Sequence, residues 1–257
     1  NPLKYIAGTP TILDIAVESA GRVNVLCSFD NSATFGSGQV TSAGSNVAVF
    51  RFSTEDLSYI SSIAGKLGAI ATTAKIVANS AGTVCFGVNT AGAISFAGVT
   101  FTTSVRYPVI VRMFNDQVVY VKRIQSTRSI VQLRVSIYAE GNCYAAGGFL
   151  ESITIDSFTS SNDALKYSLF VTKIDTTGTA SYLQTSSPIT DSITYLNPQL
   201  DCTDEGVCVV IGYLPAATLL TIGSVSITHS TSRPSTLFVL RVDPDGTVQY
   251  ILQASST

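Results

Sequence analysis

The stretch GNCYAAGGFLESITIDSFTSSNDALKYSLFVTKIDTTGTASYLQ, from Gly141 to Gln184, decides the fold. It starts with a turn glycine and an apolar run, passes through a Ser/Thr-rich hairpin, and continues into a second apolar run around Lys173. The sequence Asp-Thr-Thr-Gly then precedes a run around Tyr182, as a tight antiparallel reversal requires. Together with the preceding run RVSIYAE from Arg134, the stretch predicts four antiparallel strands and one small hairpin.

The same series of features occurs four times along the chain. Each copy has a turn glycine, a cation in its third strand and a tyrosine in its fourth: Gly21, Gly82, Gly141 and Gly206, then Arg51, Arg112, Lys173 and Arg241, then Tyr59, Tyr120, Tyr182 and Tyr250. A fifth tyrosine strand, LKYIAG with Tyr5, covers Leu3 to Gly8. A spacing of about 61 residues is typical of repeat architectures. We predict repeats at approximately 9–63, 64–124, 125–187 and 188–254, with 1–8 as a strand of a preceding repeat.

The pattern predicts an all-β fold. No stretch combines an apolar period of 3.6 residues with helix caps, so we expect almost no helix. Runs such as YPVIVRMF, from Tyr107, and VCVVIGY, from Val207, are apolar on consecutive residues, which indicates strands whose two faces are both covered. Radially stacked blades of four antiparallel strands, as in a β-propeller, meet that requirement.

The repeated order also carries a resemblance. An IAV-type strand, a turn glycine, a Val-rich strand, a small hairpin, the run F-V-x-K-x-D-x-x-G and an aromatic strand resemble the seven-bladed β-propeller repeat of large bacterial and other surface proteins. The likeness covers essentially the whole chain, although Tyr stands where the family carries Trp and there are four full repeats rather than six to eight. It implies the propeller fold and a surface or interaction role. It implies no reaction and no site residue.

Two arrangements of the repeats remain open. In one, the chain is a slice of a longer array, and residues 1–8 end a blade that precedes it. The absence of an initiator Met and of a signal-peptide pattern at Asn1 likewise favours a processed chain or a piece of a longer one. In the other, four blades close a ring, and the first strand is added at an edge. We favour the slice slightly, and an open arc would need more blades or a partner chain to cover its edges.

Composition excludes several classes of partner. Charged residues make up 12% of the 257 residues, against a usual share of about 25%, and the net charge is −2. No basic patch is available to neutralise phosphates, so nucleic acid is not expected as a partner. The uncharged run from Gly206 to Thr228 is long enough to span a bilayer, but Gly212, Pro215 and Gly223 interrupt it. It predicts two buried strands with a turn rather than membrane insertion.

The five cysteines contain no CxxC pair with the spacing of a metal site. Cys202 and Cys208 flank Thr-Asp-Glu-Gly-Val and would lie opposite each other in a β-hairpin. They are therefore candidates for a local disulfide. The alternative is that both are ordinary buried thiols.

The columns of tyrosines and cations have structural and functional interpretations. The tyrosine rings are expected to pack between blades with each hydroxyl meeting a partner or water, and the alternative is a binding stripe. The cations Arg51, Arg112, Lys173 and Arg241 are expected to lay their stems on apolar neighbours or to pair with an acid of the same or the next blade. The alternative for the cations is a channel that binds an anion.

Other polar residues yield weaker candidates. Asp243-Pro-Asp245-Gly246 begins like a calcium loop but lacks the later ligands, and the group Asp201, Asp204 and Glu205 could hold a cation only with further oxygens. We interpret both as turns. His229 is the only histidine, so a Ser-His-Asp or Cys-His site would have to use it, but it lies in a Ser/Thr-rich hairpin.

These observations lead to one main functional hypothesis. We expect no catalytic, cofactor-binding or metal-binding residues, and a non-catalytic structural or adhesive module of an extracellular, cell-surface or particle-associated assembly. Protein partners or self-assembly follow from that role. A carbohydrate-binding propeller is the alternative, and a propeller enzyme with an axial active site comes third.

Overall fold

A computed structural model describes residues 10–19, 21–68, 73–102, 106–128, 130–162, 165–189, 196–229 and 235–254. Across these residues the chain forms strands and no helix, so the all-β prediction is confirmed. The strands make six separate antiparallel sheets. Residues 1–9 lie outside the described part, and with them the predicted strand around Tyr5.

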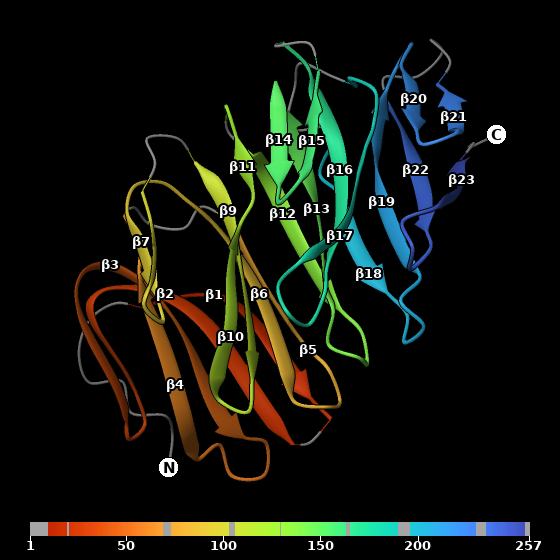
Figure 1. Cartoon of the computed structure of the whole chain (residues 1–257). Coiled ribbons are helices and arrows are strands. Elements are labelled where there is room, and N and C mark those ends of the chain that lie inside the picture. The colour runs from red at the N-terminus through yellow and green to blue at the C-terminus, as the bar shows by residue number, and fades with distance from the viewer. Residues whose placement is uncertain are drawn as a thin grey trace. The chain divides into compact units, whose positions relative to one another are not determined.

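The chain divides into two compact units, Asn1–Lys122 and Arg123–Thr257 (red to yellow-green and green to blue in Figure 1). The division lies within two residues of the predicted boundary between the second and third repeats. A single repeat domain over 1–257 stays a prediction, and each unit is described by itself.

The first unit contains two sheets. The first sheet has the order β1-β2-β3-β4-β7-β8, with strands β1 Thr11–Glu18, β2 Arg22–Phe35, β3 Gly38–Ser53, β4 Tyr59–Lys66, β7 Ile94–Phe96 and β8 Val99–Phe101. The second sheet has the order β10-β9-β6-β5, with strands β5 Thr73–Ala78, β6 Thr83–Thr90, β9 Tyr107–Phe114 and β10 Gln117–Arg123. Leu26 and Val49 of the first sheet pack against Phe86 and Val111 of the second to form the core.

The second unit contains the third and fourth sheets and two small ones. The third sheet, β12-β13-β16-β17, consists of Ile130–Ile137, Cys143–Leu150, Tyr167–Ile174 and Ala180–Thr185. The fourth sheet, β18-β19-β22-β23, consists of Gln199–Cys202, Cys208–Pro215, Ser235–Val242 and Val248–Gln253. The small sheets are β11-β14-β15, with Gln125–Ser126, Ser152–Ile155 and Phe158–Ser161, and β20-β21, with Leu219–Ile222 and Val225–Thr228.

The turns between strands follow their sequence chemistry. Gly206 N donates to Thr203 O at 2.9 Å, and Gly246 N donates to Asp243 O at 2.9 Å, so both glycines close tight reversals. Their φ angles are +79° and +91°, a region that residues with a Cβ rarely occupy. The predicted reversals at these two places are confirmed.

Burial agrees with the sequence pattern in some strands and not in others. All eight residues of β6 are buried, as are the first seven of β13, which is the burial predicted for strands covered on both faces. In β19, however, burial alternates: Val210 and Leu214 are fully buried, while Ile211 and Tyr213 are 36% and 45% exposed. The prediction of two covered faces is therefore wrong for β19.

The uncharged run from Gly206 to Thr228 also differs from its prediction. It forms three strands, β19, β20 and β21, rather than two with a turn. The third arises because Gly223, with a φ of +58°, reverses the chain between β20 and β21. Within the described residues, no helix has the length and apolarity needed to cross a membrane.

The small hairpins pair with residues next to the boundary between their own predicted repeat and the preceding one. Hairpin β7–β8 adds to β4 through the pairs Gly65–Phe96 and Lys66–Ser95. Hairpin β14–β15 pairs with β11, whose two residues follow β10 in sequence. Hairpin β20–β21 reaches the end of β17 through a bridge between Ser186 and Ile222.

The hairpin of the first predicted repeat behaves differently. Its strands are the far ends of β2 and β3, which pair from Ser32–Thr41 to Phe35–Gly38 after a register shift. The ring centroid of Phe35 lies 4.7 Å from that of Phe50, which pairs with Val25 of β2 and Ser62 of β4. This hairpin therefore folds back over its own sheet.

Candidate functional site at the interfaces between neighbouring sheets

Arg51 occupies a buried polar cluster in the first unit. Its side chain is 1% exposed, and it lies in β3 opposite Asn24 of β2. Arg51 Nε donates to Asn24 Oδ1 at 3.0 Å, and Arg51 Nη2 lies 3.2 Å from Glu18 Oε1, whose side chain is fully buried. Asn24 Nδ2 also donates to Glu18 Oε1 at 2.9 Å. Arg51 and Asn24 therefore compensate the buried negative charge of Glu18.

Arg51 also connects its sheet to the next one. Its Nη1 pairs with Asp116, which lies in the two-residue turn between β9 and β10 of the second sheet. Asp116 also accepts a hydrogen bond from Ser61 Oγ of β4 at 2.9 Å. Both turn residues, Asn115 and Asp116, have positive φ, which is typical of a tight hairpin turn. The prediction that a cation pairs with acids of its own and of the next blade-like sheet is confirmed for Arg51.

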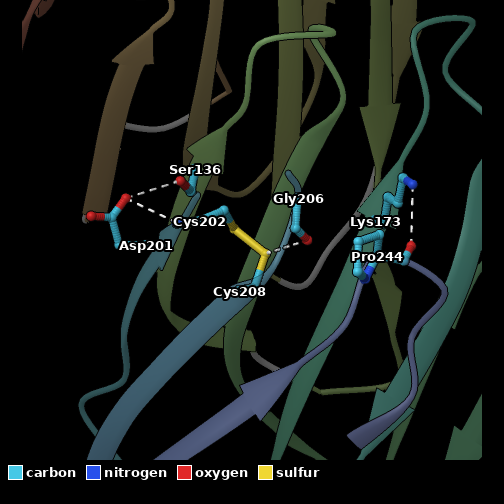
Figure 2. Close-up of a disulfide and its surroundings, with 7 residues drawn as sticks. All are labelled: Ser136, Lys173, Asp201, Cys202, Gly206, Cys208 and Pro244. Carbon is cyan, nitrogen blue, oxygen red and sulfur yellow. Dashed lines mark hydrogen bonds between the residues drawn. A yellow bond between two sulfur atoms is a disulfide. The ribbon is translucent and has the colours of Figure 1, made fainter. Parts of the chain in front are cut away.

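Lys173 makes the corresponding contact in the second unit. It lies in β16 opposite Tyr144 of β13, as Arg51 lies opposite Asn24. Figure 2 shows its Nζ donating to Pro244 O at 3.2 Å, in the turn between β22 and β23 of the fourth sheet. In both units, a cation of one sheet thus reaches the turn between the third and fourth strands of its neighbour.

The first strands of neighbouring sheets also lie side by side. In the first unit, β1 packs beside β5, and Asp14 accepts a hydrogen bond from Ile76 N at 2.8 Å and pairs with Lys75 at 3.1 Å. In the second unit, β12 packs beside β18, and Arg134 Nε donates to Gln199 Oε1 at 3.2 Å. Asp14, Lys75 and Arg134 directly precede the apolar stretch of their first strands, and Gln199 directly precedes Leu200. Equivalent positions therefore meet in both units.

Arg241 is the cation of the fourth sheet. Among the described residues, no contact joins it to a turn of another sheet. Its Nε donates to Asp243 Oδ1 of its own turn at 3.1 Å, and its side chain is 39% exposed. The side chains on the same face are mainly apolar. We call this surface the cation face of the fourth sheet; it consists of Val209, Ile211, Tyr213, Val239, Arg241, Tyr250 and Leu252.

Tyr182 and Tyr144 fill the interface between the third and fourth sheets. Tyr182 is 5% exposed, and a Cβ added to Gly246 of the fourth sheet would lie 2.7 Å from its Cγ. Its Oη is buried without a hydrogen-bond partner among the described residues, as is the Oη of Tyr144. Burial raises the pKa of both phenols well above the ordinary value, and neighbouring polar groups, Tyr138 for Tyr144 and Tyr144 for Tyr182, raise it further. For Tyr182 the structure shows the packing of the ring between sheets, while the predicted partner or water of its hydroxyl stays a prediction.

We expect Tyr182→Phe to leave the free energy of unfolding at pH 7 unchanged or slightly higher, because no hydrogen bond is lost. At alkaline pH the two proteins should differ. Unfolded tyrosines lose their protons near pH 10 while Tyr182 keeps its own, so stability falls as the pH rises above about 10. The variant should show a shallower fall in urea denaturation at pH 8, 10 and 11. Equal slopes for the two proteins would contradict the assigned burial.

Cys202 and Cys208 are joined by a disulfide at the start of the fourth sheet, as Figure 2 shows. They form a register pair of β18 and β19, and the turn between them is closed by Thr203 N donating to Val207 O at 2.9 Å. The other three cysteines, Cys27, Cys85 and Cys143, are buried and take part in no disulfide. Burial raises the pKa of Cys27 to about 12, so its thiol is protonated at neutral pH.

We expect Cys202→Ala/Cys208→Ala to lower the free energy of unfolding by about 2 kcal/mol, the value for closing so short a loop. Reduction of the wild type by a phosphine should give the same loss and leave the variant unchanged. Denaturation with and without reductant measures both effects. A wild type that is insensitive to reductant would argue against a stabilising bond.

The remaining candidates from the sequence occupy turns and a loop. Asp201 Oδ1 accepts from Cys202 N at 2.9 Å and from Ser136 Oγ of β12 at 3.4 Å, while Asp204 and Glu205 lie exposed in the turn that follows. Asp245 Oδ1 accepts from Thr247 N at 2.8 Å, which lowers the pKa of Asp245 below its ordinary value. In the described part of the chain, no three His, Cys, Asp or Glu side chains gather as metal ligands would.

His229 is 2% exposed and follows β21. Its Nδ1 lies 2.9 Å from Gln253 Nε2 of β23, and its backbone N donates to Thr218 O at 2.9 Å. The ring thus fastens the loop after the hairpin to the fourth sheet. This arrangement is that of a structural histidine.

A groove of about 370 Å³ opens in the first unit beside the hairpin that folds back. Its lining consists of Val40, Thr41, Ser42, Ala64, Gly65, Lys66, Ser95 and Ala97. Aromatic rings, which commonly line ligand pockets, are absent from that lining. The groove therefore adds nothing to the carbohydrate hypothesis.

Sequence reasoning missed the partners of the cations. The sequence pattern did not identify Glu18 or Asp116 as the acids that pair with Arg51. The contact between Asp14 and Lys75 was also missed, and a possible signal was their equivalent positions with opposite charge in successive predicted repeats. The pairing of each hairpin with the preceding segment left no recognisable signal in the sequence.

No protein-family model matches the chain, and no curated protein matches its sequence. Functional conclusions therefore depend on the residues and contacts described above.

Proposed function

We propose that the chain is an array of β-propeller-type repeats, of the kind found in the seven-bladed β-propeller repeat family, which serves as a non-catalytic interaction module. Its setting would be an extracellular, cell-surface or particle-associated assembly. The observation that carries the proposal is the recurring interface: first strands lie side by side, and a cation of one sheet contacts a turn of the next, in both units. Propeller blades pack in this manner around their axis.

The surface supports a role in binding proteins. Ile211 and Tyr213 in the centre of the fourth sheet, and Leu252 at its edge, are 36%, 45% and 57% exposed. Contiguous apolar surface on a soluble protein commonly marks an interaction site. The polar groups that chemistry would need are otherwise engaged: His229 holds a loop in place, and Cys27 is buried and protonated.

Electron microscopy of the purified chain tests this proposal. We expect particles in which several chains touch, with blade-like densities that can be counted. A preparation that holds single, separate chains at all concentrations would count against an interaction module. Blades that do not stack side by side would count against the propeller arrangement.

A further inference from the structure

We propose that the cation face of the fourth sheet binds the first strand and the acidic turn of the first sheet of a second copy of this chain, in a head-to-tail contact that uses the same two elements as the interfaces within each unit. This inference rests on the proposed function and names its partner. The complementary surface consists of Ile15 and Val17 of β1 and of the turn at residues 54–58 between β3 and β4.

The cation face matches surfaces that are covered elsewhere in the chain. Ile211 pairs with Val239 in the fourth sheet, as Leu26 pairs with Val49 in the first and Ala146 with Val171 in the third. The latter four side chains are at most 1% exposed, because they face the next sheet of their unit. Ile211 is apolar as they are but is 36% exposed. The cation face of the fourth sheet therefore has the apolar residues of a covered face, but no further sheet of the second unit covers it in the described part of the chain.

The first strand of the first sheet carries part of the other half of this interface. The folded-back hairpin already covers the middle of that face, where Phe35 and Val40 pack against Phe50. Counted from the polar residue at which neighbouring first strands meet, Ile15 corresponds to Ile76 of β5 and to Leu200 of β18. Ile76 is 2% exposed in the core between the first two sheets, and Leu200 packs against the core of the second unit. Ile15 and Val17 are instead 52% and 61% exposed. They are the apolar residues that a preceding sheet would bury.

The two surfaces also carry opposite charges. In the two interfaces within the units, Arg51 contacts Asp116 and Lys173 contacts Pro244 O, each in the turn between third and fourth strands. The corresponding turn of the first sheet carries two exposed acids, Glu55 and Asp56. Arg241, 39% exposed, is the cation that would meet them. A second copy thus offers both an apolar strand and an acidic turn to this face.

Because the two surfaces differ, the contact is heterologous, and successive copies would add in one direction to form a ring or a filament. Each of the two surfaces lies within one unit and is defined by the residues of that unit alone.

Sedimentation of the full chain over a range of concentrations tests the contact. We expect wild-type self-association, weakened at least about tenfold by Tyr213→Asp, because polar substitution of a central apolar anchor has effects of that size. Leu165→Asp is the matched control: Leu165 is 78% exposed but lies outside both surfaces, so this variant should associate like the wild type.

Charge reversal distinguishes a second copy from other occupants. Arg241→Glu and Glu55→Arg should each weaken association when alone. An equimolar mixture of the two variants should restore it, because every contact between unlike chains then joins opposite charges.

The other outcomes are decisive as well. Association that is indifferent to Tyr213→Asp and Arg241→Glu would overturn the assigned surfaces and leave the proposed function standing. A monomer in which the double variant Arg241→Glu/Glu55→Arg is more stable than either single variant, without rescue by mixing, would mean that the contact closes within one chain. A monomer that none of these substitutions affects would contradict both proposals.

Discussion

Replacing Arg51 with Met should lower the free energy of unfolding by about 3–5 kcal/mol, the usual loss when one partner of a buried ion pair is removed. Met fills a similar volume, so the packing of β3 is retained. The carboxylate of Glu18, however, would remain fully buried with only Asn24 to compensate it. The link to Asp116 in the second sheet would also be lost. Urea denaturation followed by circular dichroism measures the change.

Arg241→Met is the matched control, since Arg241 is the corresponding cation of the fourth sheet. Its side chain is 39% exposed, and its partner Asp243 is 23% exposed, so the loss should stay below about 1 kcal/mol. Adding Glu18→Gln to Arg51→Met should recover a large part of the first loss, because no buried charge is then left unpaired. Equal losses for Arg51→Met and Arg241→Met would show that the buried cluster has no special role.

Replacing Gly246 with Ala should lower the free energy of unfolding by about 3 kcal/mol. The φ angle of Gly246 is +91°, and a Cβ there would lie 2.7 Å from Cγ and 2.8 Å from Cδ1 of Tyr182. A non-glycine residue in this region of φ costs about 1–3 kcal/mol, and overpacking of a filled interface adds about 1–3 kcal/mol. Thermal or urea unfolding of the variant measures the sum.

Gly98→Ala separates these two causes. Gly98 has a similar φ of +82°, but nothing lies within 4 Å of a Cβ placed there, so only the backbone effect of about 1 kcal/mol is expected. In a Tyr182→Ala background, Gly246→Ala should also cost about 1 kcal/mol, because the ring it strikes is gone. Equal losses for Gly246→Ala and Gly98→Ala would show that the Tyr182 ring does not restrict the side chain at position 246.

Local features of the fold could be predicted from the sequence. Turn glycines and Asp-containing reversals have their own chemistry, so the sequence marked the limits of strands such as β16 and β17. The pair Cys202 and Cys208 was accessible for the same reason, since a short hairpin brings two such positions together. The two cysteines are only six positions apart in the sequence.

Contacts between sheets were harder to predict because their partners are far apart in sequence. Arg51 and Asp116 are 65 residues apart, and Arg134 and Gln199 are also 65 residues apart. The repeat length identified the cations but could not say which acid each would meet. The alternating burial of β19 escaped prediction because an apolar sequence does not show whether a neighbouring sheet covers each face.

Unfolding within each unit should be cooperative, because residues of one predicted repeat pair with strands or residues of the preceding one. By sequence, β7 and β8 follow the predicted boundary after residue 63, yet they are two of the six strands of the first sheet. Ser186, which follows β17, is likewise bridged to a hairpin that lies 36 residues further along. A fragment cut at a repeat boundary would therefore lose pairing on both sides of the cut. The boundaries of the sequence repeats do not coincide with the limits of the hydrogen-bonded sheets. The smallest piece able to fold alone should therefore span more than one repeat.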